Sequence, residues 1–171
     1  GVGATQPLCS VAGAGRIATS ELGRCWSESR PPAGGVQRIA FRRLTPKGSD
    51  IMVMSERSGR EHFIVSTAVR WEHEWYWPLS WTKDGKFIIT TDKNNPQALN
   101  HCIYRFSLEL GQKEQLTFPF PNQDDISSAL SPDGKTLAFA RGPNIGEADI
   151  YLLSLDPGKA GSEPLRLTSD M

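Results

Sequence analysis

Short apolar runs separated by turns of glycine, proline and aspartate fill most of this chain. The clearest case lies near the C-terminus, where the turn Ser131-Pro132-Asp133-Gly134-Lys135 is followed by apolar residues in the ranges 136–140 and 149–153. Proline at the second turn position presets φ, and glycine adopts the left-handed conformation that closes a hairpin. Runs this short, bounded by such turns, are typical of strands. The pattern predicts one small antiparallel sheet between Ser128 and Thr168.

A comparable pattern occurs three times when the chain is aligned on Gly48, Gly85 and Gly134, which are separated by 37 and 49 residues. Apolar or β-branched residues then recur four positions before each glycine and three and five positions after it: Leu44, Trp81 and Leu130; Ile51, Ile88 and Leu137; Val53, Thr90 and Phe139. The pairs Leu116-Thr117 and Leu167-Thr168 close the second and third units. Such repeats indicate propeller blades rather than a sandwich. We expect Leu137 and Ile150 to be buried.

The predicted fold is therefore all-β, with about three four-stranded antiparallel blades of an incomplete β-propeller ring. Residues 1–35, rich in Gly, Ala, Ser and Pro, are expected to be irregular and linker-like. Residues 36–171 are expected to form the partial propeller, with units at about 38–75, 76–121 and 122–171.

The first unit is the least regular. Its outer strand is expected from Thr67 to Trp71, while Arg43-Leu44-Thr45 also fits the closing strand of an earlier blade. An open arc of three blades leaves apolar end faces, so we expect that blades are missing or that two chains complete one ring. The chain starts without Met and stops directly after a Leu-Thr pair, which indicates a fragment of a larger protein.

The composition favours a packed globular domain, and the chain has no net charge. Hydrophobic residues make up 38% and charged residues 22%, which fits a globular core. The 19 basic and 19 acidic residues cancel, so no net charge favours nucleic acid. No apolar run approaches the roughly 18 to 20 residues of a membrane helix. We expect neither nucleic-acid binding nor membrane insertion.

The most unusual local feature is an aromatic cluster, made of Trp71, Trp75, Tyr76, Trp77 and Trp81. Exposed rings beside a cation and a histidine would form a protein-binding hot spot or a carbohydrate-stacking platform. On this interpretation the binding residues are Trp71, Trp75, His73 and Arg70. The alternative is core packing, because in a strand from Tyr76 to Trp81 the residues Trp77 and Trp81 share one face.

No catalytic residue, metal site or cofactor is expected. The three histidines, His62, His73 and His101, lie in different units without paired ligand spacing, and no Gly-x-Ser-x-Gly motif or phosphate loop occurs. Asp92 and the pair Asp124-Asp125 fit either a cation site in a channel or solvated turns. Arg38, Arg42 and Arg43 are expected to form a solvated edge. The cysteines are Cys9, Cys25 and Cys102, and both a Cys9–Cys25 disulfide and unpaired thiols stay open.

The third unit resembles the TolB-like, WD40-like β-propeller repeat. The resemblance rests on Ser131-Pro132-Asp133-Gly134-Lys135, Leu137-Ala138-Phe139-Ala140, Asp149-Ile150-Tyr151 and Leu167-Thr168. The second unit keeps Pro78, an aromatic residue and Asp84-Gly85, but has Lys83 in place of proline. The first unit departs further, with Lys47 at the aspartate position. The similarity covers about residues 38–170.

This resemblance implies a fold more than an activity. Such repeats occur in the periplasmic protein TolB, in the propellers that gate prolyl-oligopeptidase-type peptidases, and in sensory regions of bacterial regulators. We expect a non-catalytic module that holds a protein or peptide at its loop-bearing rim or central mouth. The alternatives are the accessory propeller of a prolyl-oligopeptidase-type serine peptidase and a ligand-sensing propeller of a bacterial regulator. The resemblance also implies a periplasmic or extracytoplasmic location.

Overall fold

The structure, a computed structural model, describes residues 24–27, 38–55, 57–68, 77–159 and 162–169. Its strands form three four-stranded antiparallel sheets, and the order of strands in each sheet follows their order in the sequence. The first sheet contains β1 (Arg24–Ser27), β2 (Arg38–Thr45), β3 (Gly48–Ser55) and β4 (Glu61–Thr67). The second contains β5 (Ser80–Trp81), β6 (Phe87–Asp92), β7 (Cys102–Ser107) and β8 (Lys113–Gln115). The third contains β9 (Asp124–Leu130), β10 (Thr136–Gly142), β11 (Asp149–Ser154) and β12 (Leu165–Arg166).

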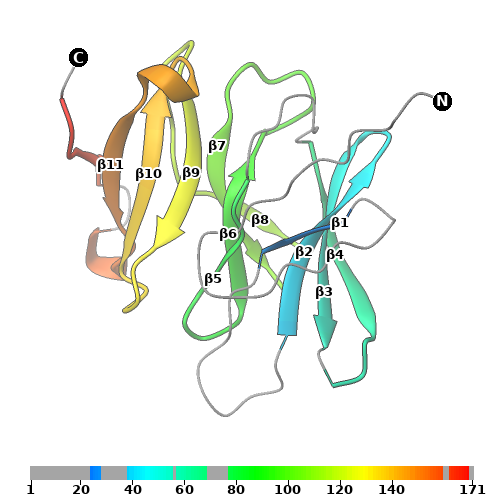
Figure 1. The fold of residues 1–171 in the computed structure, drawn as a ribbon. Coiled ribbons are helices and arrows are strands. Elements are labelled where there is room, and N and C mark those ends of the chain that lie inside the picture. Colours follow the sequence, from blue (N-terminus) through cyan, green and yellow to red (C-terminus); the bar gives the residue numbers. More distant parts are fainter. Residues whose placement is uncertain (1–23, 28–37, 56, 69–76, 160–161, 170–171) are drawn as a thin grey trace.

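The three sheets lie side by side, with the second, drawn in green, between the other two (Figure 1). In the described part of the chain the other regular elements are two short 3-10 turns, η1 (Ile145–Glu147) and η2 (Pro157–Lys159). The all-β class and the four-stranded antiparallel blades predicted from the sequence are confirmed.

The β5–β6 and β9–β10 turns have the same internal pattern of hydrogen bonds. The hydroxyls of Thr82 and Ser131 donate to the Oδ1 atoms of Asp84 and Asp133, each at 2.6 Å. The same two Oδ1 atoms accept hydrogen bonds from backbone amides two residues further on, each at 3.0 Å. Both hydroxyls also accept the backbone amide that opens the next strand. A hydroxyl and a carboxylate two residues apart therefore fix both turns.

A left-handed glycine completes each of these turns. Gly85 has φ 66° and Gly134 has φ 78°, values that residues with a Cβ rarely adopt. Lys83 stands where Pro132 stands in the other turn, yet the hydrogen bonds are the same. Proline is therefore dispensable for this turn.

The Leu-Thr pairs predicted to close the second and third units play matching roles. Thr117 Oγ1 accepts the backbone amide of Ile103 at 2.9 Å, and Thr168 Oγ1 accepts that of Ile150 at 3.0 Å. Each threonine hydroxyl thus takes the place of a backbone partner at the end of the outermost strand.

The first sheet begins earlier than the sequence predicts. Strand β1 pairs antiparallel with β2, from Arg24 opposite Arg43 to Ser27 opposite Ala40. The expectation of irregular structure for residues 1–35 does not hold for these four residues, because backbone pairing with a preformed strand needs no apolar alternation of its own. The rest of residues 1–35, and residues 69–76 in which the predicted outer strand ends, lie outside the described part. The domain division at residue 36 and the three unit boundaries stay a prediction.

Gly48 is not equivalent to Gly85 and Gly134. It lies at the start of β3 without a positive φ, and a Cβ placed on it would approach the backbone oxygen of Thr67 to 2.2 Å. Glycine is needed here because the backbones of two neighbouring segments, at Gly48 and Thr67, approach closely, and not because of a left-handed turn.

The equivalent turns of the first and second sheets are those after β3 and after β7. Gly59 and Gly111 both have φ 63°. Gly59 N donates to Ser55 O at 2.8 Å, and Gly111 N donates to Ser107 O at 3.0 Å. β3 is therefore the third strand of its sheet. Gly48 lies between the second and third strands, whereas Gly85 and Gly134 lie between the first and second, so the sequence alignment on these glycines is displaced by one strand in the first sheet. Alternation around any hairpin gives similar spacings, so the sequence could not distinguish the two registers.

Apolar residues fill both spaces between the sheets. Between the first and second sheets, the cluster consists of Ala40, Ile51, Val53, Leu79, Trp81, Ile88, Cys102, Tyr104 and Phe106. Between the second and third sheets, it consists of Ile89, Ile103, Leu137, Phe139 and Leu153. Ile88 and Ile89 are neighbours in β6 and have 0% exposure on opposite faces. The second sheet is consequently buried on both sides.

Arg42 crosses from the first sheet to the second. Its guanidinium donates from Nη1 to the hydroxyls of Ser49 and Thr67, and from Nη2 to Thr90 Oγ1 and Thr91 O, all at 2.9 Å. Only 3% of the residue is exposed, and this burial lowers its pKa to about 10. The prediction of a solvated arginine edge is wrong at this position, because the side chain finds its acceptors on a neighbouring sheet that the sequence alone does not place.

Two acidic positions expected in solvated turns are also buried. Asp125 binds the guanidinium of Arg141 through both oxygens, at 2.6 and 2.8 Å. Asp92 accepts hydrogen bonds from Lys113 Nζ and Ala68 N, each at 2.8 Å. Both carboxylates have 0% exposure. Each is compensated by a cation, as buried charges require.

Leu137 has 0% exposure, as expected, but Ile150 is 37% exposed. Ile150 lies on the outer face of the third sheet, opposite to the face that carries Phe139 and Leu153. The prediction that Ile150 is buried is wrong, because no further sheet covers this face in the described part of the chain.

Replacing Gly134 by valine should lower the free energy of unfolding by at least about 1 to 2 kcal/mol, because a β-branched residue is strained at positive φ. Gly158→Val is the control, since a Cβ at Gly158 meets no atom within 4 Å. Urea denaturation followed by tryptophan fluorescence measures both variants. Equal stability of Gly134→Val and the wild type would contradict the assigned turn.

Candidate functional site

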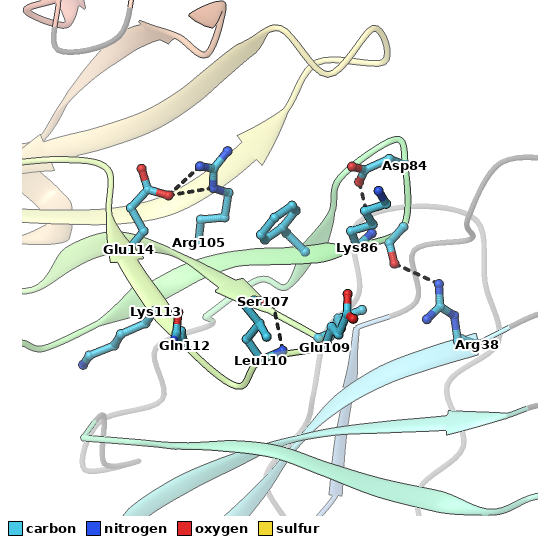
Figure 2. A pocket seen from close by; sticks show the side chains of 13 residues that line it. Arg38, Asp84, Lys86, Arg105, Ser107, Glu109, Leu110, Gln112, Lys113 and Glu114 are labelled. Atoms are coloured by element: carbon cyan, nitrogen blue, oxygen red, sulfur yellow. Dashed lines mark hydrogen bonds and ion pairs between the residues drawn. The ribbon is translucent and has the colours of Figure 1, made fainter.

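A hollow of about 530 Å³ lies where the β5–β6 and β7–β8 turns of the second sheet meet (Figure 2). It is lined by Arg38, Asp84, Gly85, Lys86, Phe87, Arg105, Ser107, Leu108, Glu109, Leu110, Gln112, Lys113 and Glu114. All but Arg38, which comes from β2, belong to the second sheet and its turns. Figure 2 shows charged side chains along its length.

Two tight turns hold the backbone of this pocket. The turn that carries Asp84 is fixed by the Thr82 hydroxyl. The β7–β8 turn closes through Ser107 N to Gln112 O at 2.8 Å, and Ser107 Oγ accepts the amide of Leu110 at 3.1 Å. Short turns with this many internal hydrogen bonds hold their side chains in defined positions.

Two arginines of the pocket are fixed before any ligand binds. Arg105 lies over the ring of Phe87 at 4.9 Å, and its Nε donates to Glu114 Oε2 at 3.1 Å. Arg38 lies over the ring of Trp81 at 4.9 Å and donates to the backbone oxygen of Gly85 at 2.8 Å. Cation–π contacts and hydrogen bonds together restrict both guanidinium groups to one orientation.

Lys113 is held in the same manner. Its ammonium group binds Asp92 Oδ2 and the backbone oxygen of Lys93, each at 2.8 Å, and lies 4.6 Å from the centre of the Tyr104 ring. Burial raises the pKa of Tyr104, so its hydroxyl stays protonated over the physiological range.

Lys86 and Glu109 differ from these groups because their charged ends make no hydrogen bond or short ion pair with the described residues. Both side chains are exposed, and so is Leu110, which follows Glu109 in the β7–β8 turn and is 66% exposed. Among the described residues, the pocket therefore offers a cation and an anion without a short ion pair, and an exposed apolar side chain, beside charges that are paired.

Among the described residues that line the pocket there is no histidine or cysteine, and Ser107 is the one hydroxyl. Its oxygen accepts a backbone amide and has no base beside it among the described lining residues. Such an arrangement can bind charged and polar groups.

The residues assigned to binding from the sequence, Arg70, Trp71, His73 and Trp75, lie outside the described residues, and that assignment stays a prediction. Trp77 stacks on the ring of His101 at 4.9 Å, and Trp81 is 6% exposed in the core. The two turns that form the pocket carry a detectable signal, since 83–86 and 109–114 combine a glycine with several charges. That signal does not reveal that the two turns are neighbours.

Other candidate chemistry is structural. His101 Nδ1 lies 3.1 Å from Asp124 Oδ1, and no group of three His, Cys, Asp or Glu side chains converges among the residues that the structure describes. Burial raises the pKa of the free thiol of Cys102 to about 11. A Cys9–Cys25 disulfide stays a prediction. In the described ranges no helix is long and apolar enough to cross a membrane.

The fold has clear relatives among solved structures, although no protein-family model and no curated protein sequence matches the chain. TolB from Acinetobacter baumannii is 19% identical with a TM-score of 0.56, over 70% of this chain and 28% of that one. A prolyl endopeptidase structure is 18% identical with a TM-score of 0.58, over 78% and 20%. The β-propeller domain of the trilobed protease from Pyrococcus furiosus is 13% identical with a TM-score of 0.51, over 83% and 43%.

These similarities establish a β-propeller fold and confirm the resemblance to TolB-like repeats at the level of structure. The chain spans less than half the length of each of these proteins.

Hydrogen bonds from Thr82 lower the pKa of Asp84 below its ordinary 3.8, with further contributions from the amide and charge of Lys86. A carboxylate with a lowered pKa stabilises the fold above pH 3.8 and loses this effect on acidification. Thr82→Val should therefore raise the pKa of Asp84 towards its ordinary value and leave the pKa of Asp133 unchanged. Ser131→Ala should raise the pKa of Asp133 and leave that of Asp84 unchanged. Carboxyl carbon NMR titration measures both, and an unmoved Asp84 pKa in Thr82→Val would refute the turn network.

Proposed function

We propose that this chain is a non-catalytic module that binds a protein or peptide through the Figure 2 pocket. The observation that carries the proposal is a recess whose arginines and Lys113 are held by hydrogen bonds, while Lys86 and Glu109 make no short ion pair with the described residues. Side chains held in their bound positions lose little conformational entropy on association. A rigid polar recess of this kind recognises partners by charge pattern.

The expected ligand carries both signs of charge. Lys86 provides a partner for a carboxylate, and Glu109 provides one for a lysine or arginine. Leu110 adds an exposed apolar contact, at 66% exposure. Charged pairs at a solvated rim contribute mainly to specificity and association rate, so we expect moderate affinity with a strong dependence on salt.

A second function is favoured by the similarity to a prolyl endopeptidase structure. On that proposal the chain is part of an accessory propeller, and the hydrolytic residues belong to a separate domain. Sequencing the gene on both sides of the segment that encodes residues 1–171 distinguishes the two functions. A following domain with a Gly-x-Ser-x-Gly motif would favour the peptidase.

We also propose that the module associates with a further blade through the outer face of its third sheet. Leu165 lies opposite Leu152 in the β11–β12 pair, on the same face as Ile150. Leu165 is 66% and Leu167 is 61% exposed. The corresponding faces of the first and second sheets are covered by the next sheet along the chain.

Selection from a phage-displayed peptide library should yield peptides that bind the wild type and lose at least about tenfold in affinity with Lys86→Glu, which corresponds to about 1.4 kcal/mol. The matched control is Lys135→Glu, because Lys135 occupies the equivalent place in the β9–β10 turn, outside the pocket. Isothermal titration calorimetry measures both. Equal loss in the two variants would reject the pocket as the binding site.

The isolated chain should have a solution mass above the 18.9 kDa of one copy, because the exposed side chains of Leu165 and Leu167 are covered by association. Leu165→Glu with Leu167→Glu should return the mass to that of one copy. Leu99→Glu, at a residue that is 85% exposed in the β6–β7 loop, is the control. Size-exclusion chromatography with light scattering measures all three. A folded wild-type monomer would contradict the proposal.

A further inference from the structure

A second hollow, of about 550 Å³, follows the outer margin between the second and third sheets. One wall is formed by β8 and the residues after it up to Phe118. The other wall is formed by the connection between β11 and β12, including Pro157, Glu163 and Pro164. We call this hollow the margin groove. It is separate from the Figure 2 pocket, although Arg105 and Glu114 border both.

Strand β8 offers an open edge along this groove. It is the last strand of the second sheet and pairs only with β7 among the strands that the structure describes. Gln112 O accepts from Ser107 N, and Leu116 N donates to Ile103 O, so both residues face β7. Alternation in an antiparallel pair then directs the amides and carbonyls of Lys113 and Gln115 outward. Groups of this kind bind an added extended strand.

Apolar residues follow the open edge. Phe118 is 72% exposed, and Leu116 and Leu155 are half-buried in the groove. Pro157 and Pro164 border the opposite side. A largely exposed aromatic ring beside a groove can bury a large area on binding at little entropic cost. The groove can therefore contact the aliphatic parts of those side chains of an added strand that face it.

The charged residues of the groove indicate which sign of charge its ligand carries. Arg105 and Glu114 neutralise one another at 3.1 Å. Asp156 and Glu163, on the opposite wall, form no ion pair with the described residues. The four charged residues of the groove therefore carry a net charge of −2. The charge of Glu163 interacts with Arg141, but neither Glu163 nor Asp156 forms a direct ion pair with the described residues, so a lysine or arginine of the ligand would complement both.

We propose that the margin groove binds an extended peptide in which basic and apolar residues alternate, paired by its backbone with Lys113 and Gln115 of β8. This inference shares with the proposed function the peptide nature of the partner and the residues Arg105, Lys113 and Glu114, whereas Asp156, Glu163 and Phe118 belong to the groove and not to the Figure 2 pocket. Successive side chains of the added strand point to opposite faces, so the basic ones face the groove, where their ammonium groups meet Asp156 and Glu163 and their methylene stems contact Phe118. An acidic peptide is repelled from the same groove.

The test uses the complete 171-residue chain and fluorescein-labelled peptides of about eight residues in which valine alternates with lysine. Fluorescence anisotropy should show saturable binding of this peptide and none of its valine–glutamate counterpart. Asp156→Lys with Glu163→Lys should weaken binding at least tenfold, and Phe118→Ala should also weaken it. Glu147→Lys is the control, since Glu147 is an exposed acid that borders neither the groove nor the Figure 2 pocket, and its charge reversal should leave the affinity within about twofold.

The backbone pairing has its own readout. Hydrogen exchange of the Lys113 and Gln115 amides, followed by NMR, should slow when the valine–lysine peptide is bound. Of two peptides, one N-methylated on every lysine and the other on every valine, only one should bind, because alternate amides of a strand point to opposite sides and only one set faces β8. Absence of binding at millimolar peptide, equal binding of the glutamate peptide, or unchanged exchange at both amides would overturn the proposal. Loss of binding in Glu109→Lys together with intact binding in Asp156→Lys/Glu163→Lys would assign the lysine peptide to the Figure 2 pocket instead of the margin groove.

Discussion

The burial of sheets on both faces is the constraint on which this structure depends. Ile88 and Ile89 are adjacent in β6, point to opposite sides and are both fully buried. Consecutive strand residues can be buried together only when another layer covers each face. The second sheet satisfies this condition between its two neighbours, whereas the third sheet leaves Ile150 and Leu165 on an uncovered face. The same requirement that holds the chain together thus leaves an apolar surface at its end.

Buried charges define how the sheets are placed against one another. Apolar contacts between sheets are not directional, but the guanidinium of Arg42 reaches its acceptors Thr90 and Thr91 only in one relative position of the first and second sheets. Arg141 and Asp125 form a buried bidentate pair within the third sheet. Such pairs contribute little net stability against a well-packed apolar core, yet leaving either partner alone is costly. We interpret them as devices that specify the arrangement of the blades.

The two proposed binding sites are separate from this framework. Packing occupies the faces between neighbouring sheets, so both proposed sites lie at hairpin ends and outer edges. The Figure 2 pocket occurs where two turns of one sheet meet, and the margin groove occurs where β8 ends the second sheet beside the β11–β12 connection. Both can change in sequence without disturbing the core, which is the usual relation between loops and a rigid scaffold.

The sequence by itself determined the features that depend on neighbouring residues. The turns at Gly85 and Gly134 and the strands on either side of them follow from hydrogen bonds that span at most five residues. The propeller class follows from the repetition of such units. Tertiary structure alone decided the rest. β1 pairs with a strand more than ten residues away, Arg42 is buried by hydroxyls from another sheet, and the Figure 2 pocket joins two separate turns to Arg38. These features arise from contacts between segments distant along the chain, and alternation of apolar residues carries no information about which segments will meet.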